Sequence, residues 1–415
     1  MVDIRFLGAC REVGRSGVHL RAGKDTFLFD YGYEVQYGHV PIQPELPLSG
    51  VFISHAHIDH SGMVPQLYNM GYKGSVYATK PTSDIMEVLL RDSLKVQKKR
   101  GEQTHFLPGN IQKAMELSKK VSYGKPVGFS ESRVTFLDAG HIPGAASILL
   151  ETGKKKVLYT GDIKFIETGL ARGARIDVKE LDALLCESTY SYKDHPDRDE
   201  LEDRLRELCQ ETIYNNGFVL IPSFAVGRTQ EVLIMLHDLG FPMHVDGMGI
   251  EMTQIMLRHP GSLRDSKELQ KAFSKAHKVD GFKDRKSVLD RPGIIICTAG
   301  MMNGGPVNYY MKKLHDRENC VLAMTGFQVE GTVGRHLLDT GRYVNEGIDV
   351  EPKMRREFFD FSAHADRSHI IDFIKRNKPS KVFLMHGDRT QDFAKELQSM
   401  GIDAHAPKNG DTVKV

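Results

Sequence analysis

The sequence has few cysteines, no excess of charge of either sign and no long apolar run. Its cysteines are odd in number and widely spaced, which argues against a secreted disulfide scaffold and favours reduced thiols. They are Cys10, Cys186, Cys209, Cys297 and Cys320. The 56 Lys and Arg nearly balance the 54 Asp and Glu. A histone-like basic wrapper and an acidic disordered tail are therefore both excluded, whereas a local basic groove is not.

The sequence also lacks any apolar run approaching the roughly 18 residues that a membrane span needs. The N-terminal segment MVDIRFLGACREVG has charged residues where a signal peptide would have an apolar core. We therefore expect a cytoplasmic protein that makes no membrane contact. At about 100 to 200 residues per domain, a chain of 415 residues is long enough for two or three domains.

Short strands alternate with helices along the chain, as expected of an α/β protein. The first part is predicted to contain strands at 3–7, 18–21, 26–30, 50–54, 132–137, 146–151 and 156–159, with helices at 63–70 and 82–99. After about Glu187 the order changes to strand, glycine turn and helix, which is typical of a parallel sheet. The final residues are predicted to form strands around 358–361 and 382–385, with a helix at 367–377.

The most informative segment is SHAHIDHSG, residues 54–62, which carries three imidazoles and a carboxylate directly after an apolar strand. His55 and His57 are two positions apart, so in an extended chain both point to one face. Asp59 and His60 fall where the chain turns into the next helix and can face a second point nearby. Imidazole and carboxylate suit zinc, with Mn²⁺ or Fe²⁺ as alternatives. A surface histidine cluster is the other interpretation, but four potential ligands at this spacing favour a metal site.

Two weaker patterns support the same interpretation. His141, in DAGHIPG, follows a predicted strand among glycines that let the backbone approach closely. Asp162, in YTGD, ends another strand and suits a carboxylate that bridges two metals. A Gly-Asp pair after a strand is usually only a turn, so Asp162 gains its weight from the cluster at residues 55–60.

The motif H-x-H-x-D-H, followed in order by His141 and Asp162, resembles the metallo-β-lactamase superfamily. Asp30, at the end of the preceding predicted strand, matches the first conserved aspartate of that superfamily. The resemblance implies an α/β fold, the metallo-β-lactamase αββα sandwich, with a dinuclear metal site at one edge.

What interrupts and closes this sandwich identifies the branch of the superfamily. Residues 190–354 separate Asp162 from two closing motifs, FSAHAD with His364 and MHGD with His386. This arrangement resembles the β-CASP nucleases, which include the cleavage and polyadenylation endonuclease subunit, its archaeal relatives and ribonuclease J. It implies a metallo-β-lactamase domain in two parts, 1–189 and 355–415, with an inserted β-CASP α/β domain at 190–354. The chain looks like a short form without N-terminal RNA-binding modules.

The resemblance also implies the role of each site residue. It implies two Zn²⁺ per chain, with Mn²⁺ as the alternative: one held by His55, His57 and His141, the other by Asp59, His60 and His386, with Asp162 bridging. Asp59 is also expected to orient the attacking hydroxide, and Asp30 to fix a ligand or the loop that carries it. His364, paired with Glu187, is the candidate general acid. DNA-acting members usually carry valine at the position of His386, so this histidine points to RNA.

Single-stranded RNA is the expected partner, contacted by the inserted domain through Ser223, Arg228 and Gly300. The expected activity is a metal-dependent ribonuclease of RNA processing or decay, acting as an endonuclease, a 5′→3′ exonuclease or both. Two other functions stay open: a non-catalytic RNA-binding scaffold subunit and a metallo-hydrolase of small molecules. A homodimer and a larger RNA-processing complex are both compatible with the sequence.

Overall fold

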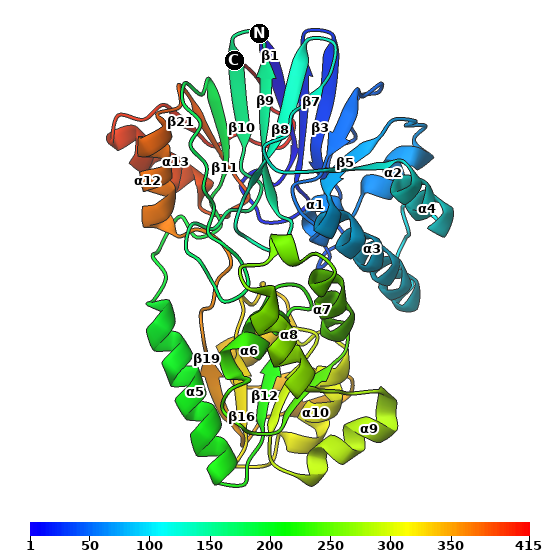
Figure 1. The fold of residues 1–415 in the computed structure, drawn as a ribbon, viewed down its shortest axis with the longest axis vertical. Helices are drawn as coiled ribbons and strands as arrows, with labels where there is room; N and C mark the ends of the chain where they lie inside the picture. Colours follow the sequence, from blue (N-terminus) through cyan, green and yellow to red (C-terminus); the bar gives the residue numbers. More distant parts are fainter. The chain divides into compact units, whose positions relative to one another are not determined.

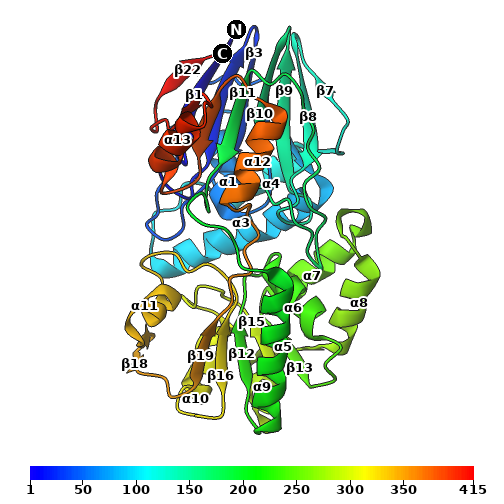
Figure 2. The same cartoon turned by 90° about the vertical axis from the view of Figure 1, so that its left-hand side faces the viewer.

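A computed structural model describes all residues, 1–415. Contacts within the chain divide it into two compact units, which Figures 1 and 2 show in two views. The first unit comprises 1–167, 172–194 and 364–415, and the second comprises 168–171 and 195–363. None of the helices is both long enough and apolar enough to cross a lipid bilayer.

The first unit contains two seven-stranded sheets. In spatial order, the first sheet consists of β22 (Thr412–Lys414), β1 (Val2–Gly8), β2 (Gly17–Ala22), β3 (Asp25–Tyr31), β4 (Gly50–Phe52), β5 (Val76–Thr79) and β6 (Ser118–Val121). The second consists of β21 (Ala404–His405), β20 (Val382–Met385), β11 (Ala183–Glu187), β10 (Lys155–Tyr159), β9 (Ala146–Thr152), β8 (Ser132–Asp138) and β7 (Val127–Gly128).

The two sheets bury their apolar faces against each other. Alternate residues along β1 and β2, such as Ile4, Phe6 and Leu20, join Phe136 and Ile148 of the second sheet in one core cluster. This alternation is the period of two expected of strands that bury one face. The outward residues of the second sheet form another cluster with α12 (Arg367–Asn377) and α13 (Thr390–Ser399). The predicted αββα sandwich is therefore confirmed.

The first sheet is flanked by its own group of helices, on the right in Figure 1. They are α1 (Ile58–Ser61), α2 (Val64–Asn69), α3 (Lys80–Arg100) and α4 (Pro108–Glu116). The predicted helix at 82–99 lies inside α3, which begins earlier because Thr79 caps it and Pro81 occupies its first turn. Gly101 ends α3 in the left-handed conformation, with φ 69°.

The second unit is built on a six-stranded sheet whose neighbouring strands all pair in parallel. Its strands, in spatial order, are β14 (His277–Lys278), β13 (Met243–Asp246), β15 (Ile294–Cys297), β12 (Val219–Pro222), β16 (Val321–Met324) and β19 (Arg355–Phe358). A small antiparallel pair is formed by β17 (Tyr343–Asn345) and β18 (Ile348–Val350).

Helices pack on both faces of this parallel sheet, as an α/β domain requires. One face is covered by residues of α5 (Arg198–Tyr214), α6 (Arg228–Leu236) and α8 (Ser266–Lys275), the other by residues of α10 (Pro306–Leu314) and α11 (Val333–Thr340). The remaining helices are α7 (Gly249–Leu257), α9 (Gly281–Ser287) and the 3₁₀ turns at Pro260–Ser262 and Val288–Asp290.

The second unit extends beyond the predicted insertion at its C-terminal end. Residues 355–363 belong to the parallel sheet because β19 pairs with β16, Arg355 opposite Val321 and Phe358 opposite Met324. The predicted strand at 358–361 therefore begins and ends earlier, at Arg355–Phe358. The sequence RREF has one apolar residue in four, so its membership of a sheet is not visible in a hydrophobic pattern.

Candidate metal centre

The predicted ligands all follow strands that end at one edge of the sandwich. Strands β3 and β4 run parallel, as do β10, β11 and β20. Their carboxyl ends lead to Asp30, the 55–60 motif, Asp162, Glu187 and His386. Residues that are far apart in the sequence are brought together in this way.

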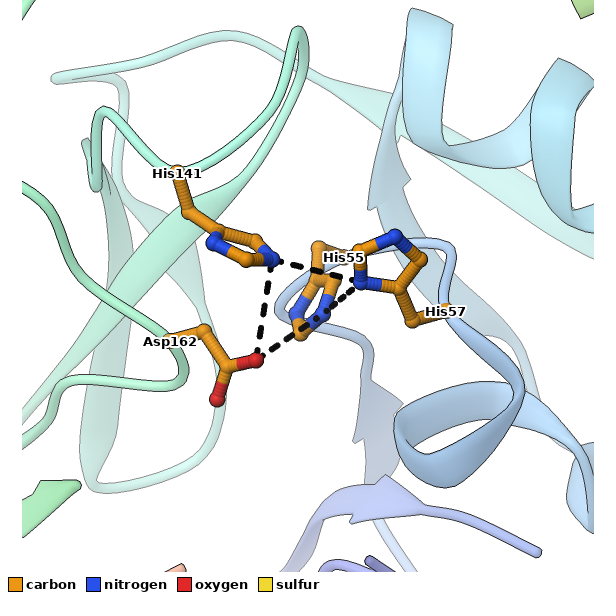
Figure 3. Close-up of side chains that lie close together, drawn as sticks. All are labelled: His55, His57, His141 and Asp162. Atoms are coloured by element: carbon orange, nitrogen blue, oxygen red, sulfur yellow. Dashed lines mark hydrogen bonds and ion pairs between the residues drawn. The ribbon is translucent and has the colours of Figure 1, made fainter. Parts of the chain in front are cut away.

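The first ligand group, drawn in Figure 3, consists of four residues: His55, His57, Asp162 and His141, which follows β8. Nδ1 of His57 lies 3.1 Å from Nε2 of His55 and 3.2 Å from Nε2 of His141. Oδ2 of Asp162 lies 3.5 Å from Nε2 of His55 and 3.6 Å from Nε2 of His141. Four nitrogen and oxygen atoms therefore face one point, which is the donor set of a zinc site.

The second ligand group consists of Asp59, His60 and His386. Oδ2 of Asp59 lies 3.3 Å from Nε2 of His386 and 3.8 Å from Nε2 of His60. Oδ1 of Asp162 lies 3.3 Å from Nε2 of His60 and 3.5 Å from Nδ1 of His386. Asp162 thus directs one carboxylate oxygen to each group.

The electrostatics of the two groups fit bound cations. Oδ1 of Asp162 is buried and has no hydrogen-bond partner, a costly state that a cation would relieve. Burial lowers the pKa of His55 well below its usual value and also lowers that of His57. Both rings are therefore neutral near pH 7 and keep the lone pairs that a metal needs. Burial would also lower the pKa of His60, but Asp162 and Asp59 raise it well above the usual value, so the second group attracts positive charge.

Asp30 lies behind the second group and is fully buried. Its carboxylate is 2.7 Å from Nδ1 of His60 and accepts hydrogen bonds from the Ser54 N–H at 2.7 Å, the Ser54 hydroxyl at 2.6 Å and the Tyr159 hydroxyl at 2.8 Å. With Nδ1 of His60 occupied in this way, Nε2 faces the ligand group. This is the arrangement of a carboxylate that orients a metal-binding histidine.

Three residues of the site with hydroxyl side chains were not predicted from the sequence. Besides bonding Asp30, the Ser54 Oγ lies 3.0 Å from Nδ1 of His55. Tyr159 donates to Asp30 from the strand that leads to Asp162, and Thr189 Oγ1 lies 3.1 Å from Nδ1 of His386. Ser54 adjoins the histidine motif and Tyr159 begins YTGD, so nearness to a motif was the available signal for both.

Two glycines beside the ligands are required by close packing. Gly161 has φ 54°, and a Cβ on it would lie 2.7 Å from the Cβ of Ser54. Gly140 has φ 69°, and its Cβ would lie 2.4 Å from the carbonyl oxygen of Lys164. Any other residue would push Asp162 or His141 out of place, because both conformations are left-handed and both spaces are filled.

His364 and Glu187 form a pair beside the ligand groups. Nδ1 of His364 is 3.1 Å from each carboxylate oxygen of Glu187 and 3.9 Å from Oδ2 of Asp162. Burial alone would lower the pKa of His364, but Glu187, ahead of Asp162, raises it to about 9. Glu187 is itself buried and accepts a hydrogen bond from the Ile163 N–H at 2.8 Å. Glu187, Asp162 and His386 also form a third group whose ligand atoms lie close enough together to hold a metal ion.

The three residues predicted to contact RNA lie in the second unit. Ser223 and Gly300 follow the adjacent strands β12 and β15, and a Cβ on Gly300 would lie 3.1 Å from the carbonyl carbon of Ser223. These two residues are therefore brought together. Arg228 begins α6 and is buried, with its guanidinium paired with Glu231 and 5.7 Å from the ring centroid of Phe361. The contact of these three residues with RNA stays a prediction.

Known families match successive parts of the chain. Residues 26–205 match a beta-lactamase superfamily domain, residues 229–337 match the Beta-Casp domain, and residues 349–407 match a Zn-dependent metallo-hydrolase RNA specificity domain. The chain is 33% identical to "Probable RNase MJ4" of Methanocaldococcus jannaschii, with 100% of both chains covered. It is 34% identical to "RNase aCSPSF2" of Saccharolobus solfataricus, with 99% of this chain and 85% of that protein covered.

A third relative is longer than this chain. "Transcription termination factor FttA" of Methanocaldococcus jannaschii is 33% identical over 100% of this chain and 72% of its own length. Among solved structures, a protein of unknown function from Enterococcus faecalis V583 has the same fold, with a TM-score of 0.65 at 15% identity and 99% of both chains covered. Because its full-length relatives and its domain matches agree, the chain belongs to the β-CASP ribonuclease family of the metallo-β-lactamase superfamily.

Proposed function

We propose that the chain hydrolyses RNA phosphodiesters with two zinc ions. His55, His57 and His141 would hold one ion and Asp59, His60 and His386 the other, with one oxygen of Asp162 directed to each group. The observation that carries this proposal is the carboxylate of Asp162, whose two oxygens lie 3.3 to 3.6 Å from nitrogens of two separate ligand groups. Mn²⁺ prefers carboxylate and water ligands. Of the six side chains around Asp162, five are histidines and one is an aspartate, which favours zinc.

When bound, the two ions would supply a hydroxide at neutral pH and stabilise the charge that develops on the reacting phosphate. Asp59 is placed to accept a hydrogen bond from the attacking hydroxide, since its side chain is 30% exposed while Asp162 is 3% exposed. Asp30 keeps His60 in one tautomer through the 2.7 Å contact at Nδ1.

His364 acts as the general acid. With a pKa of about 9, its ring is protonated at neutral pH and can give a proton to the departing ribose 3′-oxygen. Glu187 holds the ring through Nδ1 and leaves Nε2 as the donor. The products are an RNA with a 3′-hydroxyl and an RNA with a 5′-phosphate.

The second unit contributes RNA contacts through the loops that follow β12 and β15. Ser223 and Gly300 lie in these loops, at the carboxyl ends of parallel strands, where α/β domains bind their ligands, and Arg228 begins the helix that follows the first loop. Single-stranded RNA is the proposed substrate, because a chain without base pairing can bring its backbone to a buried edge. The names of the RNase relatives and of the RNA specificity domain support this choice.

We place the protein in the cytoplasm, where thiols stay reduced. All five cysteines are free and buried, which fits a reducing compartment. Whether the chain acts alone, as a homodimer or in an RNA-processing complex follows from its mass in solution, measured with and without RNA.

Metal content and cleavage of an RNA labelled at its 3′ end test the proposal. We expect about two zinc ions per chain, as the two ligand groups provide. Progressive shortening that requires a 5′-monophosphate identifies a 5′→3′ exonuclease, and discrete internal fragments whatever the 5′ end identify an endonuclease. Bound metal without cleavage of 5′-triphosphate, 5′-monophosphate or 5′-hydroxyl RNA would overturn the proposal in favour of a scaffold.

A further inference from the structure

One exposed aromatic side chain lies beside the His364–Glu187 pair and has no part in the chemistry described so far. Tyr192 is 44% exposed. Its ring is stacked on that of Tyr190, with centroids 6.1 Å apart and planes at 19°. The buried ring of Tyr190 lies 6.1 Å from the ring of His364. The three rings form a row that begins at His364 and ends at the surface with Tyr192.

Two cations accompany the exposed end of this row. The Arg389 guanidinium carbon lies 5.2 Å from the ring centroid of Tyr192, and Lys193 Nζ lies 5.3 Å from that of Tyr190 and 6.0 Å from that of Tyr192. These distances are close to the outer limit of about 6 Å for a cation–π contact. Arg389 is exposed and pairs with no acidic side chain, so its guanidinium is available to a phosphate.

The segment that carries Tyr192 is held firmly to the first unit. The Ser191 N–H donates to the Ser188 carbonyl at 3.2 Å, and Tyr190 forms a parallel bridge with Asp366. The Asp194 carboxylate accepts hydrogen bonds from the N–H and the hydroxyl of Ser368, both at 2.8 Å. A ring fixed in this way can bind a flat ligand at little cost in entropy.

We propose that Tyr192, with Arg389 and Lys193, forms a subsite that stacks one base of single-stranded RNA beside the scissile phosphate. An exposed aromatic ring flanked by cations is the combination that binds a base together with its phosphate. The inference rests on the proposed function, which makes His364 the donor to the departing 3′-oxygen. Because the row starts at His364, the stacked base belongs to the first or second nucleotide on the 5′ side of the cut.

Removing the base and removing the ring test the same contact from both sides. The substrate is an RNA with one mapped cut, prepared intact and with a single abasic residue at each position near the cut. For the wild type, an abasic residue at the first or second position on the 5′ side should raise KM about tenfold, the loss of one base–aromatic stack. Tyr192→Ala should raise KM for the intact RNA equally, and the abasic residue should then add nothing.

Three variants separate stacking from a general loss of structure. Tyr192→Phe keeps the ring and should behave as the wild type. Arg389→Gln should raise KM and reduce its dependence on salt, because one phosphate contact is lost. Tyr214→Ala removes a more exposed tyrosine, 76% exposed in the second unit, and should change nothing. In each variant kcat should stay within about twofold and metal content should be unchanged, since uniform binding affects KM alone.

Binding provides a readout that does not depend on cleavage. A 2-aminopurine base at the sensitive position should lose fluorescence when the wild type binds the RNA in EDTA, and Tyr192→Ala should abolish this quenching. Equal KM for wild type and Tyr192→Ala, or abasic effects that add to the loss of the ring, would overturn the subsite. Wild type that quenches 2-aminopurine but cleaves no RNA would retain the subsite and overturn the proposed function.

Discussion

The metal edge of the first unit and the strand ends of the second unit differ in what they present. The first gathers the seven side chains of the two ligand groups, which could hold metal ions, and Asp162 has a buried oxygen there without a hydrogen-bond partner. The second presents a buried serine, a glycine and an arginine already paired with Glu231. The first edge thus has carboxylate oxygens and imidazole nitrogens that could take up cations, whereas the arginine of the second is already balanced by Glu231. Possible metal ligands therefore gather at the edge of the first unit, whereas close packing and a paired arginine characterise the strand ends of the second.

The largest effect is expected from a substitution of Asp162, whose carboxylate faces both ligand groups. Asp162→Asn leaves the size of the side chain unchanged but removes the charge that serves both groups. We expect RNA cleavage to fall by about 10⁴-fold or more, because stabilisation of several kcal/mol at the reacting phosphate is lost. Bound zinc should also fall by at least one ion per chain, as measured by mass spectrometry of the dialysed protein. Full zinc content with full activity would show that the two groups work without Asp162.

Removing the proton donor should have the next largest effect. His364→Ala should lower kcat about 10²- to 10³-fold, the contribution of a general acid. The zinc content should stay at the wild-type value, because His364 is not in the two groups that combine histidine with Asp162 or Asp59. A parallel loss of zinc would instead make His364 a ligand.

The pH profile sharpens the role of Glu187. A general acid works in its protonated form, so kcat should fall as pH rises through the pKa of His364, about 9 before metal binding. Glu187 raises that pKa. Glu187→Gln should therefore move the alkaline fall of kcat to lower pH, while Glu187→Asp should move it less. An alkaline limb that stays in place in Glu187→Gln would assign it to another group.

A smaller effect is expected from a substitution of Asp30, which contacts the ligand His60 but belongs to neither ligand group. Asp30→Asn should weaken zinc affinity about 10- to 100-fold, the usual cost of losing a carboxylate that orients a histidine ligand. Competition with a graded series of chelators measures this directly. Tyr159→Phe removes one hydrogen bond to the same carboxylate and serves as a milder companion, with a loss below that of Asp30→Asn.

The smallest effect should be at Arg228, beyond the end of β12 in the second unit. Arg228→Met keeps the length of the side chain and removes its charge, and Glu231 still has Arg198 at 3.1 Å. We expect unfolding to become easier by about 1 to 2 kcal/mol, the cost of one lost buried hydrogen-bonding partner, as measured by urea denaturation. RNA affinity should fall as well, because Arg228 is one of the proposed RNA contacts. Unchanged RNA affinity would leave Arg228 with a structural role alone.

The sequence alone allowed a prediction of the fold and the metal site where residues of suitable chemistry occur at a characteristic spacing. The four potential ligands at residues 55–60 predicted a metal site, and their resemblance to the metallo-β-lactamase superfamily implied the sandwich. Ser54 and Tyr159 could not be assigned, because a hydroxyl carries no spacing signal and their partner Asp30 is remote in sequence. The pairing of Arg355–Phe358 with β16 was missed for a related reason: a short, charged strand owes its place to main-chain hydrogen bonds.

The parallel pair of β11 and β20 has a consequence for synthesis. Glu187 lies opposite Met385 in that pair, and the N–H of His386 donates to the carbonyl of Ala9 at 2.6 Å. A ribosome must therefore translate the whole inserted unit before His364 and His386 can reach the residues made first. Until then, a nascent chain has the residues of the first ligand group but lacks His386 of the second. The second ligand group and the His364–Glu187 pair are therefore completed only near the end of synthesis.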